Sequence, residues 1–163
     1  MKRMTDMLSL VAHLPEVAFA PGEVVIAEGG SARAIWVLVS GCLRVRQGDM
    51  VVNVISQPGA VVGEISVLLN TVYTATVEAA EPSVLRHAAD GAALLASEPA
   101  ITTFVAVGLA ERLHFVTSYL VDLKHQYGDA PGLAMIPDVL RELTQRQRPA
   151  ARPGSARDPN PEY

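Results

Sequence analysis

A change in the spacing of apolar residues sets the strongest limit on the fold of this chain. Between Phe19 and His87 the sequence breaks into short apolar runs, each closed by a turn that contains glycine or proline. Residues 43–46 (LRVR) alternate apolar and polar side chains, which is the period of a β-strand with one buried face. Short strands at intervals of roughly ten residues are typical of an antiparallel sandwich, barrel or roll. We therefore expect this whole segment to be β-structure.

Helical patterns flank the β segment on both sides. Residues 4–14 place apolar side chains three or four positions apart and stop at Pro15, which predicts a short helix within residues 1–18. A long helix is predicted from about Ile101 to Tyr127, where the helical period returns. The expected fold class is α+β and mainly β. It is an antiparallel β-roll, of the double-stranded β-helix or jelly-roll type, flanked by an N-terminal helix and a long C-terminal helix.

The predicted long helix carries an apolar seam. Its members recur at spacings of four and three residues: Val105, Leu109, Leu113, Val116, Leu120 and Leu123. Such a seam often packs against a partner helix, including the same helix of a second copy, which would give a homodimer through residues 101–127. The same seam is expected of a helix that only covers the roll. The sequence leaves both interpretations open.

The segments after the long helix are short. A glycine-rich and proline-containing break at 128–132 begins a linker, and a short helix within 128–145 can start at Pro137, a residue tolerated in the first helical position. Residues 146–163 contain four prolines and almost no apolar side chain, a composition typical of a disordered tail. The β-roll with its long closing helix is thus expected to span residues 19–127.

Charge and cysteine content exclude several classes of protein. The formal net charge is −4, whereas nucleic-acid-binding domains carry a basic surface. The single cysteine, Cys42, cannot form an internal disulfide, which is compatible with a reducing compartment. We read no secretory signal and no apolar run of the roughly 20 residues that a membrane span needs. The expected location is the cytoplasm.

The sequence contains none of the common motifs of enzymes and metalloproteins. The four histidines are scattered, and none lies in a metal-ligand motif with cysteine, aspartate or glutamate. The sequence has no Walker loop, no nucleophile elbow and no dinucleotide-binding glycine fingerprint. We therefore expect neither an enzyme nor a bound metal or cofactor.

The segment from Val61 to Val77 carries the clearest chemical signal. Gly63 follows an apolar strand and opens a single helical turn, after which a new strand begins. The first amides of a helical turn lack internal partners and can bind an anion. Gly63 allows a phosphate to approach the backbone, and Glu64 can accept a hydrogen bond, for example from a ribose hydroxyl. By spacing alone, a Gly-Glu turn between strands is also an ordinary turn.

Residues 19–125 together resemble the cyclic-nucleotide-binding domain of the catabolite-activator and kinase regulatory-subunit type. The resemblance rests on the order and spacing of six segments: 21–25 (PGEVV), 28–30 (EGG), 35–41 (IWVLVSG), 58–59 (PG), 63–68 (GEISVL) and 74–79 (TATVEA). It implies a β-roll flanked by helices. It also implies a sensor whose expected ligand, cyclic AMP, lies over the short helix after Gly63 and is covered by the long helix.

The resemblance also assigns ligand-binding residues. Glu64 would hold the ribose 2′-hydroxyl, and amides near the turn and the next strand would face the cyclic phosphate. Thr117 and Ser118 are similar to a Thr-Ser pair that touches adenine in the bacterial activator. The residues so assigned are Gly63, Glu64, Ile65, Ser66, Tyr73, Thr74, Ala75, Thr117 and Ser118.

One departure from the family pattern concerns Tyr73. Binders of cyclic nucleotides usually carry an arginine immediately before the strand that begins near Thr74, where it pairs with the phosphate. A phenol offers one neutral donor in place of a charged fork. Hydrogen bonds to charged groups are worth about 1.5–3 kcal/mol. The loss of the arginine is therefore expected to lower the affinity for a cyclic nucleotide by roughly one to two orders of magnitude. The alternative function is a degenerate, ligand-free module for protein interaction or dimerisation.

A second departure lies after the long helix. Activator-type members continue into a helix-turn-helix, whereas about 35 residues follow Gly128 here. We therefore expect no direct DNA binding. Occupancy of the sensor would be passed through the C-terminal helices to a protein partner that the sequence does not identify.

Overall fold

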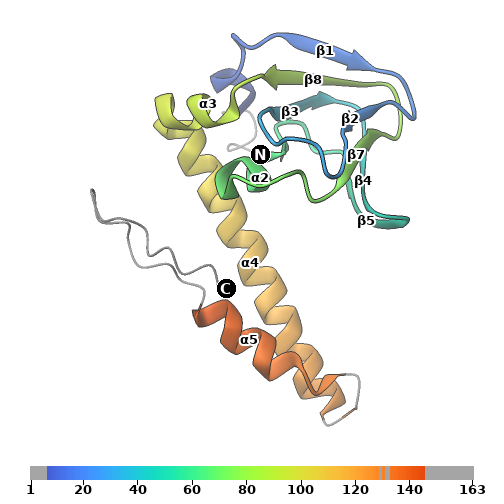
Figure 1. Cartoon of the computed structure of the whole chain (residues 1–163), viewed down its shortest axis with the longest axis vertical. Coiled ribbons are helices and arrows are strands. Elements are labelled where there is room, and N and C mark those ends of the chain that lie inside the picture. The colour runs from blue at the N-terminus through green and yellow to red at the C-terminus, as the bar shows by residue number, and fades with distance from the viewer. Residues whose placement is uncertain (1–6, 129, 131–132, 146–163) are drawn as a thin grey trace. The chain divides into compact units, whose positions relative to one another are not determined.

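A computed structural model describes residues 7–128, 130 and 133–145 of the chain (Figure 1). The chain forms two units, residues 1–109 and residues 110–163. The first unit contains all eight described strands, and the second contains the C-terminal part of helix α4 (Pro99–Tyr127) and helix α5 (Ile136–Gln145). The predicted tail, 146–163, lies outside the described residues.

The strands form two antiparallel sheets of four strands each, as the spacing of the turns predicts. The first sheet has the order β1 (Glu16–Phe19), β8 (Ser83–Ala88), β3 (Ile35–Ser40) and β6 (Val61–Val62). The second has the order β2 (Val24–Ile26), β7 (Thr76–Ala79), β4 (Leu43–Gln47) and β5 (Met50–Ile55). Successive strands repeatedly change sheet, which makes the first unit a β-roll and confirms the predicted fold class.

The first strand pairs with the last one. Glu16 lies opposite Arg86, and Phe19 lies opposite Ser83, so the roll is closed by residues far apart in the chain. Figure 1 shows β1 and β8 running side by side at one edge of the first unit. The β-structure begins at Glu16, three residues before the start that the sequence pattern predicts. The preceding turn ends before Pro15, and the residues after Pro15 pair with β8.

Buried side chains form two clusters in the first unit. One lies between the two sheets and includes Leu38, Leu43, Tyr73 and Val77. The other packs the sheet against helices: Met7, Val11, Ile35, Val37, Val61, Ala88, Leu94, Leu95, Ile101 and Val105. Strand β3 is therefore buried on both faces, which explains why residues 35–39 form a continuous apolar run rather than an alternating one.

Helices complete the first unit. Residues 7–10 are helical and the turn after them ends before Pro15, as predicted. Helix α2 (Glu64–Leu69) follows β6, and α3 (Gly91–Ser97) follows β8. The carboxylate of Asp90 accepts a hydrogen bond from the amide of Ala93 at 2.9 Å and so caps α3.

Helix α4 has buried side chains near its start and exposed ones further along. Ile101 and Val105 are buried in the core of the first unit, whereas Leu113, Phe115 and Tyr119 are exposed. Among the described residues, α4 is the one helix long and apolar enough to cross a membrane, by length and composition alone. The expectation that the chain has no membrane span stays a prediction, since length and composition alone do not decide it.

Candidate ligand-binding site

Gly63 has a backbone conformation that excludes other residues. It links β6 to α2 with a φ of 90°, in the left-handed region that side chains disfavour. A Cβ atom at this position would lie 2.8 Å from the carbonyl oxygen of Ala34 and 3.3 Å from the side chains of Ile26 and Tyr73. The predicted turn is thus present, and it is packed against β2 and the start of β3.

Helix α2 is short, with six residues. Glu64 is its first residue and is only 4% exposed, as is Ser66, whereas Ile65 faces solvent. Asn70 adopts a left-handed conformation and ends the helix, and its amide donates to the carbonyl oxygens of Ser66 and Val67. The site segment therefore has a buried carboxylate at the first turn of a helix that Asn70 caps at its C-terminal end.

The structure places the Tyr73 side chain in the core between the two sheets. Its hydroxyl donates to the carbonyl oxygen of Ala34 at 2.8 Å and accepts from the Ala34 amide at 3.0 Å. Its own backbone is bonded to Gly29 and Gly30. The sequence suggested a phenol that faces a phosphate, but this hydroxyl already has a donor and an acceptor in the protein. This pairing could not be predicted from the sequence, because Ala34 lies 39 residues away.

The other predicted site residues fall into two groups. Thr74 and Ala75 follow Tyr73 directly, and the exposed Thr74 accepts a hydrogen bond on its carbonyl oxygen from Gln47. Gly63, Glu64, Ile65, Ser66, Tyr73, Thr74 and Ala75 all belong to the first unit. Thr117 and Ser118 lie on the part of α4 that belongs to the second unit, so their role stays a prediction.

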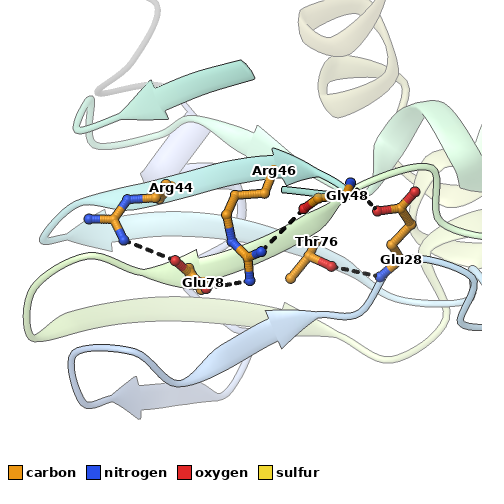
Figure 2. Close-up of polar contacts among 6 residues, drawn as sticks. All are labelled: Glu28, Arg44, Arg46, Gly48, Thr76 and Glu78. Carbon is orange, nitrogen blue, oxygen red and sulfur yellow. Dashed lines mark hydrogen bonds and ion pairs between the residues drawn. The ribbon is translucent and has the colours of Figure 1, made fainter. Parts of the chain in front are cut away.

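Polar side chains follow the outer face of the second sheet (Figure 2). Glu78 of β7 accepts hydrogen bonds from Arg44 and Arg46 of β4, each at 3.0 Å. These residues alternate along their strands with buried Leu43 and Val77, so they point away from the core. The hydrogen bond from Arg46, together with the Arg44 guanidinium, holds the pKa of Glu78 below its usual value of 4.5.

The same face continues to the β4–β5 turn. The Glu28 carboxylate accepts from the amide of Gly48 at 3.0 Å, and the amide of Glu28 donates to the Thr76 hydroxyl at 3.1 Å. Figure 2 shows these contacts joining the loop after β2, the turn after β4 and strand β7. Sequence reasoning did not find them, because alternation reveals which side chains share a face of one strand and not the register between strands.

Two further features bear on the chemistry. No group of three or more metal-ligating side chains occurs in the part of the chain that the structure describes. A shallow hollow of about 440 Å³ lies between the segment before β1, the end of β8 and α3, and its lining is mainly apolar. None of the residues predicted to bind the ligand lines this hollow.

Comparisons with known proteins agree with this geometry. Residues 16–92 match the family model described as the cyclic nucleotide-binding domain. No match was found among curated proteins. Among solved structures, the chain is similar to the catabolite activator protein of Thermus thermophilus, with 20% identity and a TM-score of 0.57, over 89% of this chain and 84% of that one.

Two other solved structures have comparable folds. The N-terminal domain of a transcriptional regulator from Streptomyces coelicolor A3(2) is 23% identical with a TM-score of 0.51, over 71% of this chain and 86% of that one. A structure described as belonging to a cyclic-GMP-dependent signalling pathway that regulates bacterial phytopathogenesis is 20% identical with a TM-score of 0.57, over 67% and 93%. At these identities the likeness shows the fold.

Proposed function

The chain belongs to the cyclic nucleotide-binding domain family through residues 16–92, and on that premise we propose that it is a sensor that binds a cyclic nucleotide at the Gly63 turn. The observation that carries this proposal is the pair Gly63-Glu64. The glycine has no room for a side chain, and the carboxylate that follows is buried at the first residue of α2. A carboxylate at the first residue of a helix also matches the position that the resemblance assigns to the ribose contact.

The proposed contacts follow from the chemistry of the turn. A cyclic phosphate would approach the backbone amides at the start of α2, since the first amides of a helical turn lack partners inside the helix. The Glu64 carboxylate is an acceptor for a ribose hydroxyl, and hydrogen bonds that involve a charged partner are stronger than neutral ones. We propose cyclic AMP as the ligand, because Thr117 and Ser118 are similar to an adenine-contacting pair in the bacterial activator.

The proposed output is regulatory. The chain would be a non-enzymatic cytoplasmic receptor that passes occupancy through α4 and α5 to a partner, without binding DNA itself. Helix α4 begins in the core of the first unit, where Ile101 and Val105 are buried. A change in core packing on ligand binding would therefore act directly on the first turns of α4.

Isothermal titration calorimetry with cyclic AMP and cyclic GMP tests the ligand proposal. The full chain should bind at least one of them, and Glu64→Gln should weaken binding roughly tenfold or more by removing the charged acceptor. Glu81→Gln, a change at an exposed position, is the matched control and should bind like the native chain. Absence of heat at about millimolar ligand would refute the proposal.

The second candidate is a ligand-free interaction module, and two observations favour it. The Tyr73 hydroxyl is fully engaged within the protein, and α4 exposes large apolar side chains such as Leu113 and Tyr119. Light scattering after size-exclusion chromatography tests the self-pairing form of this function. A dimer that Leu113→Glu and Leu120→Glu convert to a monomer supports it, and a native monomer rejects it.

A further inference from the structure

The Gly63 turn has no cation of its own. The segment from Val61 to Val77 contains neither lysine nor arginine. A cyclic phosphate keeps its negative charge at neutral pH, and a guanidinium binds such a group about twice as strongly as a neutral donor does. A cation that pairs with the ligand's phosphate would therefore come from another segment of the chain.

Few cations are available in the first unit. Its described residues, 7–109, include four arginines and no lysine. Three arginines are engaged elsewhere: Arg44 and Arg46 with Glu78, and Arg86 with Glu16 and the carbonyl oxygen of Leu14. Within this described part, Arg33 is the only arginine whose side chain has no hydrogen bond or ion pair to the protein.

The backbone places Arg33 beside the turn. Its neighbour Ala34 carries the carbonyl oxygen nearest to where a Cβ atom of Gly63 would lie, and both backbone groups of Ala34 are bonded to the Tyr73 hydroxyl. On the other side, the carbonyl oxygen of Arg33 accepts from the amide of Gly91 at 2.8 Å. The main chain of Arg33 is thus fixed one residue from the contact with Gly63, while its side chain is exposed.

We propose that Arg33 is the cationic partner of the ligand's phosphate. This assignment rests on the proposed binding of a cyclic nucleotide at the Gly63 turn. Tyr73 and Arg33 then have separate tasks: the phenol fixes the main chain of Ala34, and the guanidinium next to it supplies the charge. Because the guanidinium moves from solvent onto the phosphate, part of the binding energy is electrostatic and is screened by salt.

Calorimetry on the full chain tests this role with a ligand pair that differs in the phosphate. Arg33→Ala should weaken cyclic AMP binding about tenfold to a hundredfold, which is the scale of one hydrogen bond to a charged group. Arg33→Lys should recover part of the loss, since lysine keeps the charge without the planar fork. Affinity for adenosine, which lacks the phosphate, should be the same in all three proteins.

Arg44→Ala is the matched control, because Arg44 lies on the outer face and pairs with Glu78. It should leave cyclic AMP affinity and its dependence on salt unchanged, whereas Arg33→Ala should reduce the salt dependence. If the native chain binds cyclic AMP and Arg33→Ala binds it equally well, the assignment is wrong while the proposed function stands. If the native chain binds no cyclic nucleotide, both are rejected.

Discussion

Replacing Tyr73 by phenylalanine should destabilise the roll although the ring itself is retained. The hydroxyl serves both backbone groups of Ala34, at 2.8 Å and 3.0 Å, and phenylalanine leaves that amide and carbonyl without these partners. An unsatisfied buried polar group costs about 1–3 kcal/mol. Because these bonds are only partly buried, the lower end applies to each group, and we expect a total loss of about 2 kcal/mol.

Urea denaturation followed by circular dichroism measures this loss as a lower midpoint with an unchanged slope. In a thermal scan it corresponds to a decrease of about 4–8 °C for a chain of this size. Tyr119→Phe is the control, since Tyr119 is 55% exposed and its ring contact with Phe115 survives the change. A free energy of unfolding for Tyr73→Phe within about 0.5 kcal/mol of the native value would refute the reasoning.

Two further predictions concern the turn and the outer face. Gly63→Ala should lower the free energy of unfolding by more than Gly48→Ala, measured in urea, because both have a positive φ but only Gly63 lacks space for a Cβ atom. Equal losses would contradict the steric argument. Because the pKa of Glu78 is lowered in the folded state, its ionised carboxylate stabilises the fold above a pH of about 4.5. This contribution is lost as the pH falls through the lowered pKa of the folded state. Glu78→Gln should therefore flatten the pH dependence of unfolding below that pH, and an unchanged profile would contradict this.

The sequence was sufficient to predict the β-roll because its turns depend on residue type. Gly63, Gly41 and Gly59 all have positive φ angles in the structure, and few residues other than glycine accept such angles. The apolar runs between these glycines then have the length of single strands. The fold and the position of the candidate site therefore followed from turn chemistry and spacing.

The partners of individual side chains could not be predicted in the same way. Tyr73 forms hydrogen bonds with Ala34, which is 39 residues away in the sequence, and Arg44 forms one with Glu78, which is 34 residues away. The Arg44–Glu78 pair depends on the register between β4 and β7, and a shift by one residue would reverse the face of every side chain in a strand. The exposure of the apolar side chains of α4 could not be predicted either, because their spacing is the same whether or not another element covers them.

The pairing of β1 with β8 has a consequence for synthesis on the ribosome. Among the described strands, β1 pairs only with β8, and Glu16 pairs with Arg86 only after the whole roll has been made. Contacts between residues this far apart in the chain form slowly, since a long loop must close first. A nascent chain that stops before Ser83 therefore exposes an unpaired strand edge, and the domain is expected to fold only after its last strand has emerged.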